Sequence, residues 1–226
     1  MQGILYVIST PIGNLGDITK RAVETLENLD ILLVEDTRVS GKLLKNFDIE
    51  ARMVSFNEYS EKTKTASIVS LLKEGKTVGI ISDAGTPLIS DPGFLLVREA
   101  IKNNIKVTAI PGPTALIHAL SVSGLPTDKF IFLGYLPKKE GKRVNTLKNL
   151  KKASEYITAT VIFYESPYRL FATLRNINDI FGDINVVVCR ELTKIHEEVL
   201  RESASKLFDH FSATAPKGEF TLLFHL

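Results

Sequence analysis

Short, uninterrupted apolar runs alternate with helix-like segments through the first 125 residues of this 226-residue chain. The run Ile4–Ile8 shows no alternation of polar and apolar residues, as a strand buried on both faces of a parallel sheet requires. Four further strands are expected here, at 31–34, 53–56, 77–81 and 106–110. Because helix-like segments separate these runs, the pattern predicts an α/β domain whose parallel sheet is covered on both faces.

The segments between the runs carry signals for helix ends. Asp17 is expected to cap a helix whose apolar residues share one face. Gly75 is expected to close a helix over residues 60–74. The pair Asp91-Pro92 is typical of a helix N-cap followed by proline in the first turn. Two further helices are expected over residues 38–47 and 113–122.

A linker is expected at Leu125-Pro-Thr-Asp128, where the regular alternation ends. Strand-like runs at 130–135, 159–164, 186–189 and 220–224 follow it, with helices between some of them. We therefore expect two α/β domains, residues 1–125 with a parallel sheet and residues 126–226 with a mixed sheet. A cleft is expected between the two domains.

Three loops rich in glycine and proline follow strands of the first domain. The longest is Ser82-Asp-Ala-Gly-Thr-Pro-Leu-Ile-Ser-Asp-Pro-Gly93, and the other two are Ser9–Gly16 and Ile110–Ala115. Open α/β sheets bind ligands outside the carboxyl ends of their strands. Glycine allows a ligand to approach the backbone closely, because it has no side chain. The sequence therefore predicts a ligand site at this edge of the sheet.

Composition excludes several classes of protein. No apolar run reaches the length of a membrane span, and no signal peptide precedes the first strand, so we expect a cytoplasmic protein. The single Cys189 lies in the apolar run Val186–Cys189 and is interpreted as a buried structural thiol.

The net charge of +2 conceals one basic segment, which runs from Lys138 to Lys152. It contains seven lysines and arginines and one acid, Glu140. A run of this kind is either a solvated helix face or a contact for the phosphates of a nucleic acid, and charge alone leaves both interpretations open.

Common motifs for nucleotides, metals and nucleophiles are not found. The first loop lacks the G-x-G-x-x-G spacing, and no G-x-x-x-x-G-K-[ST], paired-cysteine, H-x-x-x-H or G-x-S-x-G pattern occurs. We therefore expect no metal site. The pattern favours an uncharged or zwitterionic ligand with an adenosine-like part.

Taken together, seven motifs closely resemble one protein family. They are Ser9-Thr-Pro-Ile-Gly-Asn-Leu-Gly-Asp-Ile18, Glu35-Asp-Thr-Arg38, Ser82–Gly93, Pro111-Gly-Pro-Thr-Ala115, Phe163-Tyr-Glu-Ser-Pro-Tyr-Arg169, Cys189-Arg-Glu-Leu-Thr-Lys194 and Lys217-Gly-Glu219. The family is the bacterial small-subunit (16S) rRNA methyltransferases that modify the ribose 2′-hydroxyl of a decoding-centre cytidine, within the tetrapyrrole methylase superfamily. The resemblance covers residues 4–226.

The resemblance implies a tetrapyrrole methylase-like fold that binds S-adenosyl-L-methionine in the cleft between two α/β domains. It implies a cofactor site made of loop residues from both domains, namely Pro11, Ser82, Asp83, Ala84, Gly85, Thr114, Ala115, Tyr164 and Gly218. It also implies that the substrate is 16S rRNA, either as free RNA or within the 30S subunit, which is the expected form, and that the protein is a homodimer. Many members of the family continue past the last strand with a helical extension, whereas this sequence stops at Leu226.

Polar residues of these motifs are the candidates for catalysis. We expect Asp36 or Glu165 to take the proton from the hydroxyl, and Arg38 and Arg190 to contact RNA. The alternative for Asp36 is a helix cap that is ion-paired with Arg38. Further candidates for substrate binding are Asn14, Arg169 and Lys194. The asparagine could hydrogen-bond the ribose or base of the target nucleotide, and the two cations could hold a neighbouring phosphate.

Two other functions remain open on the sequence. One is a tetrapyrrole-precursor C-methyltransferase on the same fold, and the other is a non-catalytic adenosine-nucleoside sensor or RNA-binding scaffold. Since one fold hosts many functions, the motifs rather than the fold favour the RNA methyltransferase.

Overall fold

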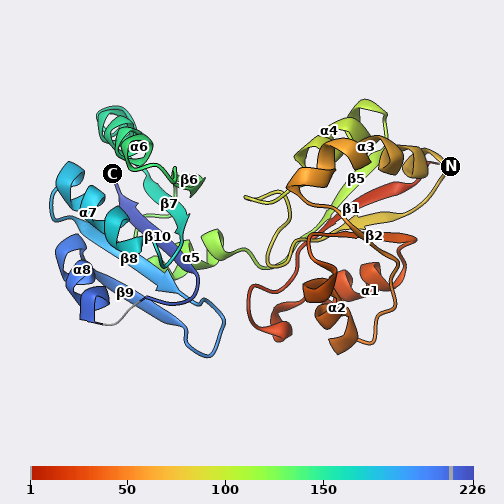
Figure 1. Ribbon diagram of the computed structural model, residues 1–226, viewed down its shortest axis with the longest axis horizontal. Coiled ribbons are helices and arrows are strands. Elements are labelled where there is room, and N and C mark those ends of the chain that lie inside the picture. The colour runs from red at the N-terminus through yellow and green to blue at the C-terminus, as the bar shows by residue number, and fades with distance from the viewer. Residues whose placement is uncertain (1, 214–215) are drawn as a thin grey trace. The chain divides into compact units, whose positions relative to one another are not determined.

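The computed structural model describes residues 2–213 and 216–226. The chain divides into two compact units, which meet in the sequence between Thr114 and Ala115 (Figure 1). Each unit contains one five-stranded sheet. The α/β class predicted from the sequence is confirmed.

The sheet of the first unit is wholly parallel, with the strand order β3-β2-β4-β1-β5. Its strands are β1 (Ile4–Ile8), β2 (Ile31–Val34), β3 (Met53–Ser55), β4 (Val78–Ile80) and β5 (Lys106–Ile110). The chain leaves β1 toward β2 on one side and leaves β4 toward β5 on the other. The neighbouring strands β1 and β4 therefore form the point at which the strand order reverses, where sheets of this kind bind ligands.

Helices cover both faces of this sheet, as predicted (Figure 1). Helices α3 (Glu58–Lys73) and α4 (Phe94–Lys102) pack on one face with side chains such as Leu5 and Leu33. Helices α1 (Lys20–Glu27) and α2 (Thr37–Asn46) pack on the other face with Ile8 and Leu32. Neighbouring residues of β2 thus face opposite cores, which explains why the run has no polar residue.

Two predicted helix caps are wrong. Asp17 ends a short 3-10 helix, η1 (Leu15–Asp17), and Thr19 caps α1 by accepting from the N–H of Ala22. The Asp91-Pro92 pair lies ahead of α4, which begins at Phe94. The cap prediction at Gly75 is correct, because Gly75 follows the end of α3 with a φ of 95°.

A distant carboxylate replaces the local cap of α4. Buried Glu61 of α3 accepts hydrogen bonds at Oε1 from the N–H groups of Gly93 and Leu95, at 3.0 and 2.8 Å. A carboxylate at a helix N-terminus satisfies free N–H groups and complements the helix dipole. Glu61 therefore fixes the end of the 82–93 loop.

The sheet of the second unit is mixed, as predicted, with the order β6-β7-β10-β8-β9. Strand β6 (Phe130–Tyr135) lies parallel to β7 (Thr160–Glu165). Strands β10 (Phe220–His225), β8 (Asn185–Arg190) and β9 (Glu198–Ser203) continue the sheet with antiparallel pairing. Helices α6 (Glu140–Ala153), α7 (Leu170–Phe181) and α8 (Ala204–Ala213) contribute side chains to its core.

Helix α5 (Ala115–Ser123) groups with the second unit, whereas the sequence placed it in the first domain. It contacts β7 and β10. Arg201 of β9 donates from Nε to the Ser123 carbonyl at 3.0 Å and from Nη2 to the Val122 carbonyl. These bonds satisfy carbonyl groups at the helix end, which ties α5 to the second sheet.

Candidate functional site

Three loops meet at the carboxyl edge of the first sheet. Thr10, after β1, and Gly85, after β4, exchange backbone hydrogen bonds of 2.8 and 3.1 Å in an isolated antiparallel bridge. The Thr10 hydroxyl also lies 3.3 Å from the Ser82 carbonyl. The bridge spans the point at which the strand order reverses, so the first and second loops form one structure there.

Side chains join the third loop to the other two. The Ser9 and Thr86 hydroxyls lie 3.0 Å apart, and Thr86 donates to the Pro113 carbonyl at 3.1 Å. The Ser9 N–H donates to the Ile110 carbonyl at 3.1 Å. The loops after β1, β4 and β5 thus converge, as the sequence predicted for this unit.

Two glycines permit this close packing. Gly85 has a φ of 82°, and a Cβ there would lie 3.2 Å from Cγ2 of Ile12. A Cβ on Gly112 would lie 2.9 Å from Cβ of Ser9. The neighbouring Asp83 and Ala84 are exposed, so their backbone groups are open to a ligand.

The loop after β2 joins the same edge through Asp36. Its N–H donates to Oδ1 of Asp83 at 3.2 Å. Its carboxylate caps α2, because Oδ1 accepts from the Arg38 N–H at 2.8 Å. The Arg38 guanidinium binds the same carboxylate, with Nη2 at 2.5 Å from Oδ2.

These bonds argue against Asp36 as the base. The hydrogen bonds from the Arg38 side chain and backbone lower the pKa of Asp36 to about 2. A carboxylate that binds its proton so weakly is a poor acceptor at neutral pH. The structure therefore agrees with the alternative, in which Asp36 caps the helix and pairs with Arg38.

A cluster of three carboxyl groups lies beside this pair. Burial, followed by the charges of Asp91 and Asp83, raises the pKa of Glu35 to about 7. Burial raises the pKa of Asp91 to about 6, although the Ser82 hydroxyl opposes the shift. Desolvation also raises the pKa of Asp83. Among the described residues, no group hydrogen-bonds the buried Oε1 of Glu35.

Glu165, the other predicted base, is a structural carboxylate. It is 1% exposed. Its oxygens accept from the Ser166 N–H at 2.8 Å and the Thr173 hydroxyl at 2.7 Å, and Oε1 lies 2.7 Å from Nη2 of Arg169. These partners take up most of its lone pairs and argue against Glu165 as the base; its role in taking a proton from substrate stays a prediction.

The three cations of the second unit that were predicted to bind substrate all have partners within that unit. Arg169 also donates to the Leu136 carbonyl at 2.8 Å, which makes it structural. Arg190 donates from Nε to the Lys217 carbonyl at 2.8 Å. Lys194 lies 2.9 Å from both Glu191 and Glu219. Contacts of Arg190 and Lys194 with RNA stay predictions.

Two cofactor residues predicted in the second unit are Tyr164, which lies in β7, and Gly218, which is exposed in the loop before β10. The Tyr164 ring packs edge-on against Phe132 and Tyr135. Gly218 has a φ of 97°, and a Cβ there would lie 2.6 Å from Cδ of Glu191. Only glycine fits this position. The cofactor roles of Tyr164 and Gly218, and the cleft between the two domains, stay predictions.

The remaining predicted site residues lie in the first unit or where the two units join in sequence. Pro11 is buried, and Asn14 caps η1 by accepting from the Gly16 N–H at 2.9 Å. Thr114 and Ala115, which end the third loop, are half-buried.

Sequence reasoning missed three groups at this edge, because it chose Asp36 rather than its neighbour Glu35 as the base and gave Asp91 and Thr86 no role at the ligand site. Asp91 was interpreted as a helix cap, and Thr86 was one of several hydroxyls in the loop. The signal for Asp91 was its place next to Pro92 in a loop with a second acid, Asp83.

Cys189 in β8 is buried as predicted, and burial raises its pKa to about 12.

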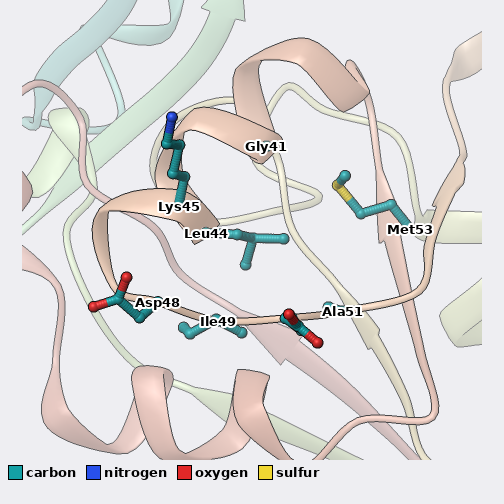
Figure 2. Close-up of a pocket in the computed structure, with 8 residues that line it drawn as sticks. Gly41, Leu44, Lys45, Asp48, Ile49, Ala51 and Met53 are labelled. Atoms are coloured by element: carbon teal, nitrogen blue, oxygen red, sulfur yellow. The ribbon is translucent and has the colours of Figure 1, made fainter.

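A separate hollow of about 530 Å³ lies between α2 and β3 (Figure 2). Its lining contains none of the predicted site residues and consists of Gly41, Leu44, Lys45, Asp48, Ile49, Glu50, Ala51 and Met53.

Within residues 2–213 and 216–226, no helix is long and apolar enough to cross a membrane.

Comparison with known proteins gives one consistent family. The sequence pattern of the Tetrapyrrole (Corrin/Porphyrin) Methylases matches residues 4–207. A protein of Thermotoga maritima named ribosomal RNA small subunit methyltransferase I is 48% identical over 222 residues, which is 98% of each chain. Proteins of the same name from Halalkalibacterium halodurans and Vibrio cholerae are 45% and 44% identical, over 98% of this chain and 75% and 77% of theirs.

Solved structures agree on the fold. The uroporphyrin-III-C-methyltransferase of Thermus thermophilus aligns over 98% of this chain and 94% of its own, with a TM-score of 0.65 and 17% identity. The cobalt precorrin-4 methyltransferase CbiF, a cobalamin biosynthetic enzyme, aligns over 97% of this chain and 94% of its own, with a TM-score of 0.67 and 18% identity. At such low identity the likeness concerns the fold alone.

Proposed function

The chain belongs to the tetrapyrrole (corrin/porphyrin) methylase family, and we propose that it methylates the ribose 2′-hydroxyl of a decoding-centre cytidine in 16S rRNA. The relatives that are 44–48% identical over nearly the whole chain are named for methyl transfer to small-subunit ribosomal RNA. The motifs Ser9–Ile18 and Glu35–Arg38 support the ribose hydroxyl as the acceptor rather than a tetrapyrrole carbon.

We infer that S-adenosyl-L-methionine is the methyl donor. When bound, it supplies a methyl group on an electrophilic sulfonium. The observation that carries this assignment is the joining of the loops after β1, β4 and β5 at the strand reversal, next to a carboxyl cluster. Glycine turns there leave backbone groups accessible, which suits a ligand with ribose hydroxyls and an amino-acid end.

The charge at this edge also suits the donor. The charges of Asp91 and Asp83 raise the pKa of Glu35, and the charge of Asp83 raises that of Asp91, so their negative potentials overlap. A sulfonium and an ammonium group are favoured in such a potential, and each would in turn favour the ionised carboxylates. Arg38 is already neutralised by Asp36 and offsets little of this potential.

Alignment is the main task of the loops in methyl transfer. The reacting hydroxyl, the methyl carbon and the sulfur must lie in line, and fixing such a geometry lowers a barrier by roughly 7–11 kcal/mol. The bridge between Thr10 and Gly85 and the bond between Thr86 and Pro113 hold the three loops in one arrangement. The site is therefore ordered within the first unit before a ligand arrives.

Glu35 is the group that takes the hydroxyl proton in this proposal. A base works best when its pKa lies near the working pH, and that of Glu35 is about 7. Its buried Oε1 has no hydrogen-bond partner among the described residues, so no donor there stabilises the charged form over the protonated one. Asp36, whose pKa is about 2, is a weaker proton acceptor, and the oxygens of Glu165 already accept from Ser166 and Thr173 and pair with Arg169.

The proposal extends to the context of the reaction. The substrate is taken to be the assembled 30S subunit, which places the enzyme in the cytoplasm, and the active form is taken to be a homodimer. Both statements follow from the family resemblance described for the motifs.

The direct test is methyl transfer to 30S subunits from a strain that lacks the modification. The protein is incubated with these subunits and S-adenosyl-L-methionine labelled in its methyl group, and the labelled nucleoside is identified and mapped. The proposal expects 2′-O-methylcytidine at a single decoding-centre position. A label on a base, at another site, or on an added tetrapyrrole precursor instead of RNA would overturn it.

A further inference from the structure

Helix α6 presents one strongly basic face. Arg143, Leu147 and Leu150 are buried and lie on one side of the helix. The opposite side is exposed and consists of lysines and asparagines only, with Gly141 at its start: Lys142, Asn145, Lys148, Asn149 and Lys152. At 1.5 Å per residue the face from Lys142 to Lys152 is about 15 Å long. Exposed Lys138 and Lys139 precede it.

The lysines of this face differ in their partners from three exposed lysines elsewhere in the chain. Those three pair with an acid three or four residues away: Lys20 with Glu24 at 3.6 Å, Lys102 with Glu99 at 2.8 Å, and Lys206 with Glu202 at 3.0 Å. The structure described here shows no such ion pair for Lys142, Lys148 or Lys152.

The spacing on α6 is in fact repulsive. Lys148 and Lys152 are four residues apart on the helix, whereas Lys138 precedes its first residue, Glu140. Like charges at this spacing destabilise a helix, so the arrangement is unfavourable in the free protein. A polyanion across this face would remove the repulsion. A merely solvated face would gain from mixed charges, as on α1, α4 and α8.

The first turn of α6 is open to an anion as well. The N-cap residue, Lys139, makes no side-chain capping bond, and the first N–H groups of the helix point toward its positive dipole end. Gly141 is exposed, and a Cβ built there would have no atom within 4 Å. A phosphate oxygen could thus reach the backbone of this turn without hindrance.

Buried Arg143 holds the same turn in place. Its Nε donates to Oδ1 of Asn176 on α7 at 2.8 Å, and its Nη1 lies 3.4 Å from the Lys138 carbonyl. Immediately after α6, Tyr156 is 85% exposed, which offers an aromatic ring at the end of the basic face. Lysines beside an exposed aromatic ring are typical of surfaces that bind single-stranded nucleic acid.

On the basis of the RNA substrate proposed above, we propose that the exposed face of α6, with Lys138 and Lys139, binds the phosphate backbone of the ribosomal RNA outside the catalytic site. The lysines neutralise phosphates, and Asn145 and Asn149 hydrogen-bond phosphate or sugar oxygens. Because none of these contacts reads a base edge, the face supplies affinity and orientation and no sequence selection. The absence of apolar residues from the face argues against a membrane surface, which an amphipathic helix binds through its apolar side.

The test is the salt dependence of binding to 30S subunits that lack the modification. The triple variant Lys142→Gln, Lys148→Gln and Lys152→Gln removes three charges from the face. Its slope of log affinity against log salt should be shallower by about 2–3, since each phosphate contact contributes about 0.7–0.9. Between 50 and 200 mM salt the unchanged protein should therefore lose about 20- to 40-fold more affinity than the variant.

A matched control is the triple variant Lys20→Gln, Lys102→Gln and Lys206→Gln, which removes the same charge from paired lysines. It should keep the original slope, and both variants should bind S-adenosyl-L-methionine as the unchanged protein does. Equal slopes in all three proteins would overturn the proposal, as would lysine-dependent binding of phosphatidylserine vesicles without binding of 30S subunits. Lysine-dependent binding of 30S subunits without any methyl product would support the face and count against the proposed function alone.

Discussion

The substitution Glu35→Gln distinguishes a catalytic role of this carboxylate from a structural role. Gln keeps the size of the side chain and resembles the protonated acid, so the surrounding packing is preserved. Gln cannot ionise, so the variant lacks the negative charge that the Glu35 carboxylate carries above about pH 7. The same substitution should therefore lower activity and raise stability, which is the opposite of what loss of a structural carboxylate does.

The effect on stability follows from the pKa. The value of about 7 is about 2.5 pH units above the ordinary 4.5 of a glutamate, and one pH unit corresponds to about 1.4 kcal/mol. Because Glu35 is partly exposed, solvent screening reduces the total from about 3.4 to about 1–2 kcal/mol. Below pH 4.5 Glu35 is protonated in both states, so its contribution is fully present; it is lost as pH rises through 7.

Wild type and Glu35→Gln should therefore unfold alike at pH 4, while the variant should be about 1–2 kcal/mol more stable at pH 8. Denaturant unfolding at both pH values measures this difference. Initial rates of methyl transfer to 30S subunits should fall by about 10²–10⁴ in the variant, and the rise in rate through pH 7 should disappear.

Glu99→Gln is the matched control, since Glu99 is half-buried on α4 and the hydrogen bond from Lys102 lowers its pKa. It should change neither the methylation rate nor its pH profile. The account of Glu35 is refuted if Glu35→Gln keeps its rate and its pH profile. A variant that is less stable than wild type at pH 8 would refute the argument from burial.

Three further substitutions test the roles assigned to neighbouring groups. Asp36→Asn should keep the methylation rate within several-fold, because Asn caps helices as well as Asp does; a loss of 10² or more would restore Asp36 as the base. Glu165→Gln should destabilise the protein by about 3–5 kcal/mol in denaturant unfolding, because it leaves Arg169 partly buried without its counter-charge; wild-type stability would show that the pair is not structural. Gly85→Ala should weaken binding of S-adenosyl-L-methionine in calorimetry by about tenfold or more. The control is Gly124→Ala, at a similar φ but with no atom within 4 Å of its Cβ. It should strain the backbone by about 1–2 kcal/mol and leave binding of S-adenosyl-L-methionine intact. Equal affinities of the two glycine variants would contradict the site.

The strands and the ligand edge were predictable because each depends on local sequence. The run Ile31–Val34 is apolar at every position because both faces of the sheet are covered, and this pattern needs no knowledge of partners. The loop Ser82–Gly93 could be placed at a sheet edge because it follows such a run. The convergence of the three loops followed from parallel strand direction alone.

The errors concern groups whose partners are distant in the sequence. Asp91 was expected to cap α4, but Glu61, which lies on another helix, binds the N–H groups at that end. From the sequence, Glu165 was expected to be free to accept a proton. In the structure its carboxylate accepts a hydrogen bond from the Thr173 hydroxyl and pairs with the Arg169 guanidinium. Helix α5 was assigned to the first domain because its end is followed by Leu125-Pro126, but its contacts with β7 and β10 and the bonds from Arg201 join it to the second sheet.

The account depends most on where the methyl donor binds. A crystal structure of the protein grown with S-adenosylhomocysteine, the demethylated product, tests this directly. We expect the product against the backbone of Asp83, Ala84 and Gly85 and beside the loops that carry Pro11 and Thr114. Product bound in the hollow between α2 and β3, elsewhere on the protein, or not at all at saturating concentration would contradict the site and the function built on it.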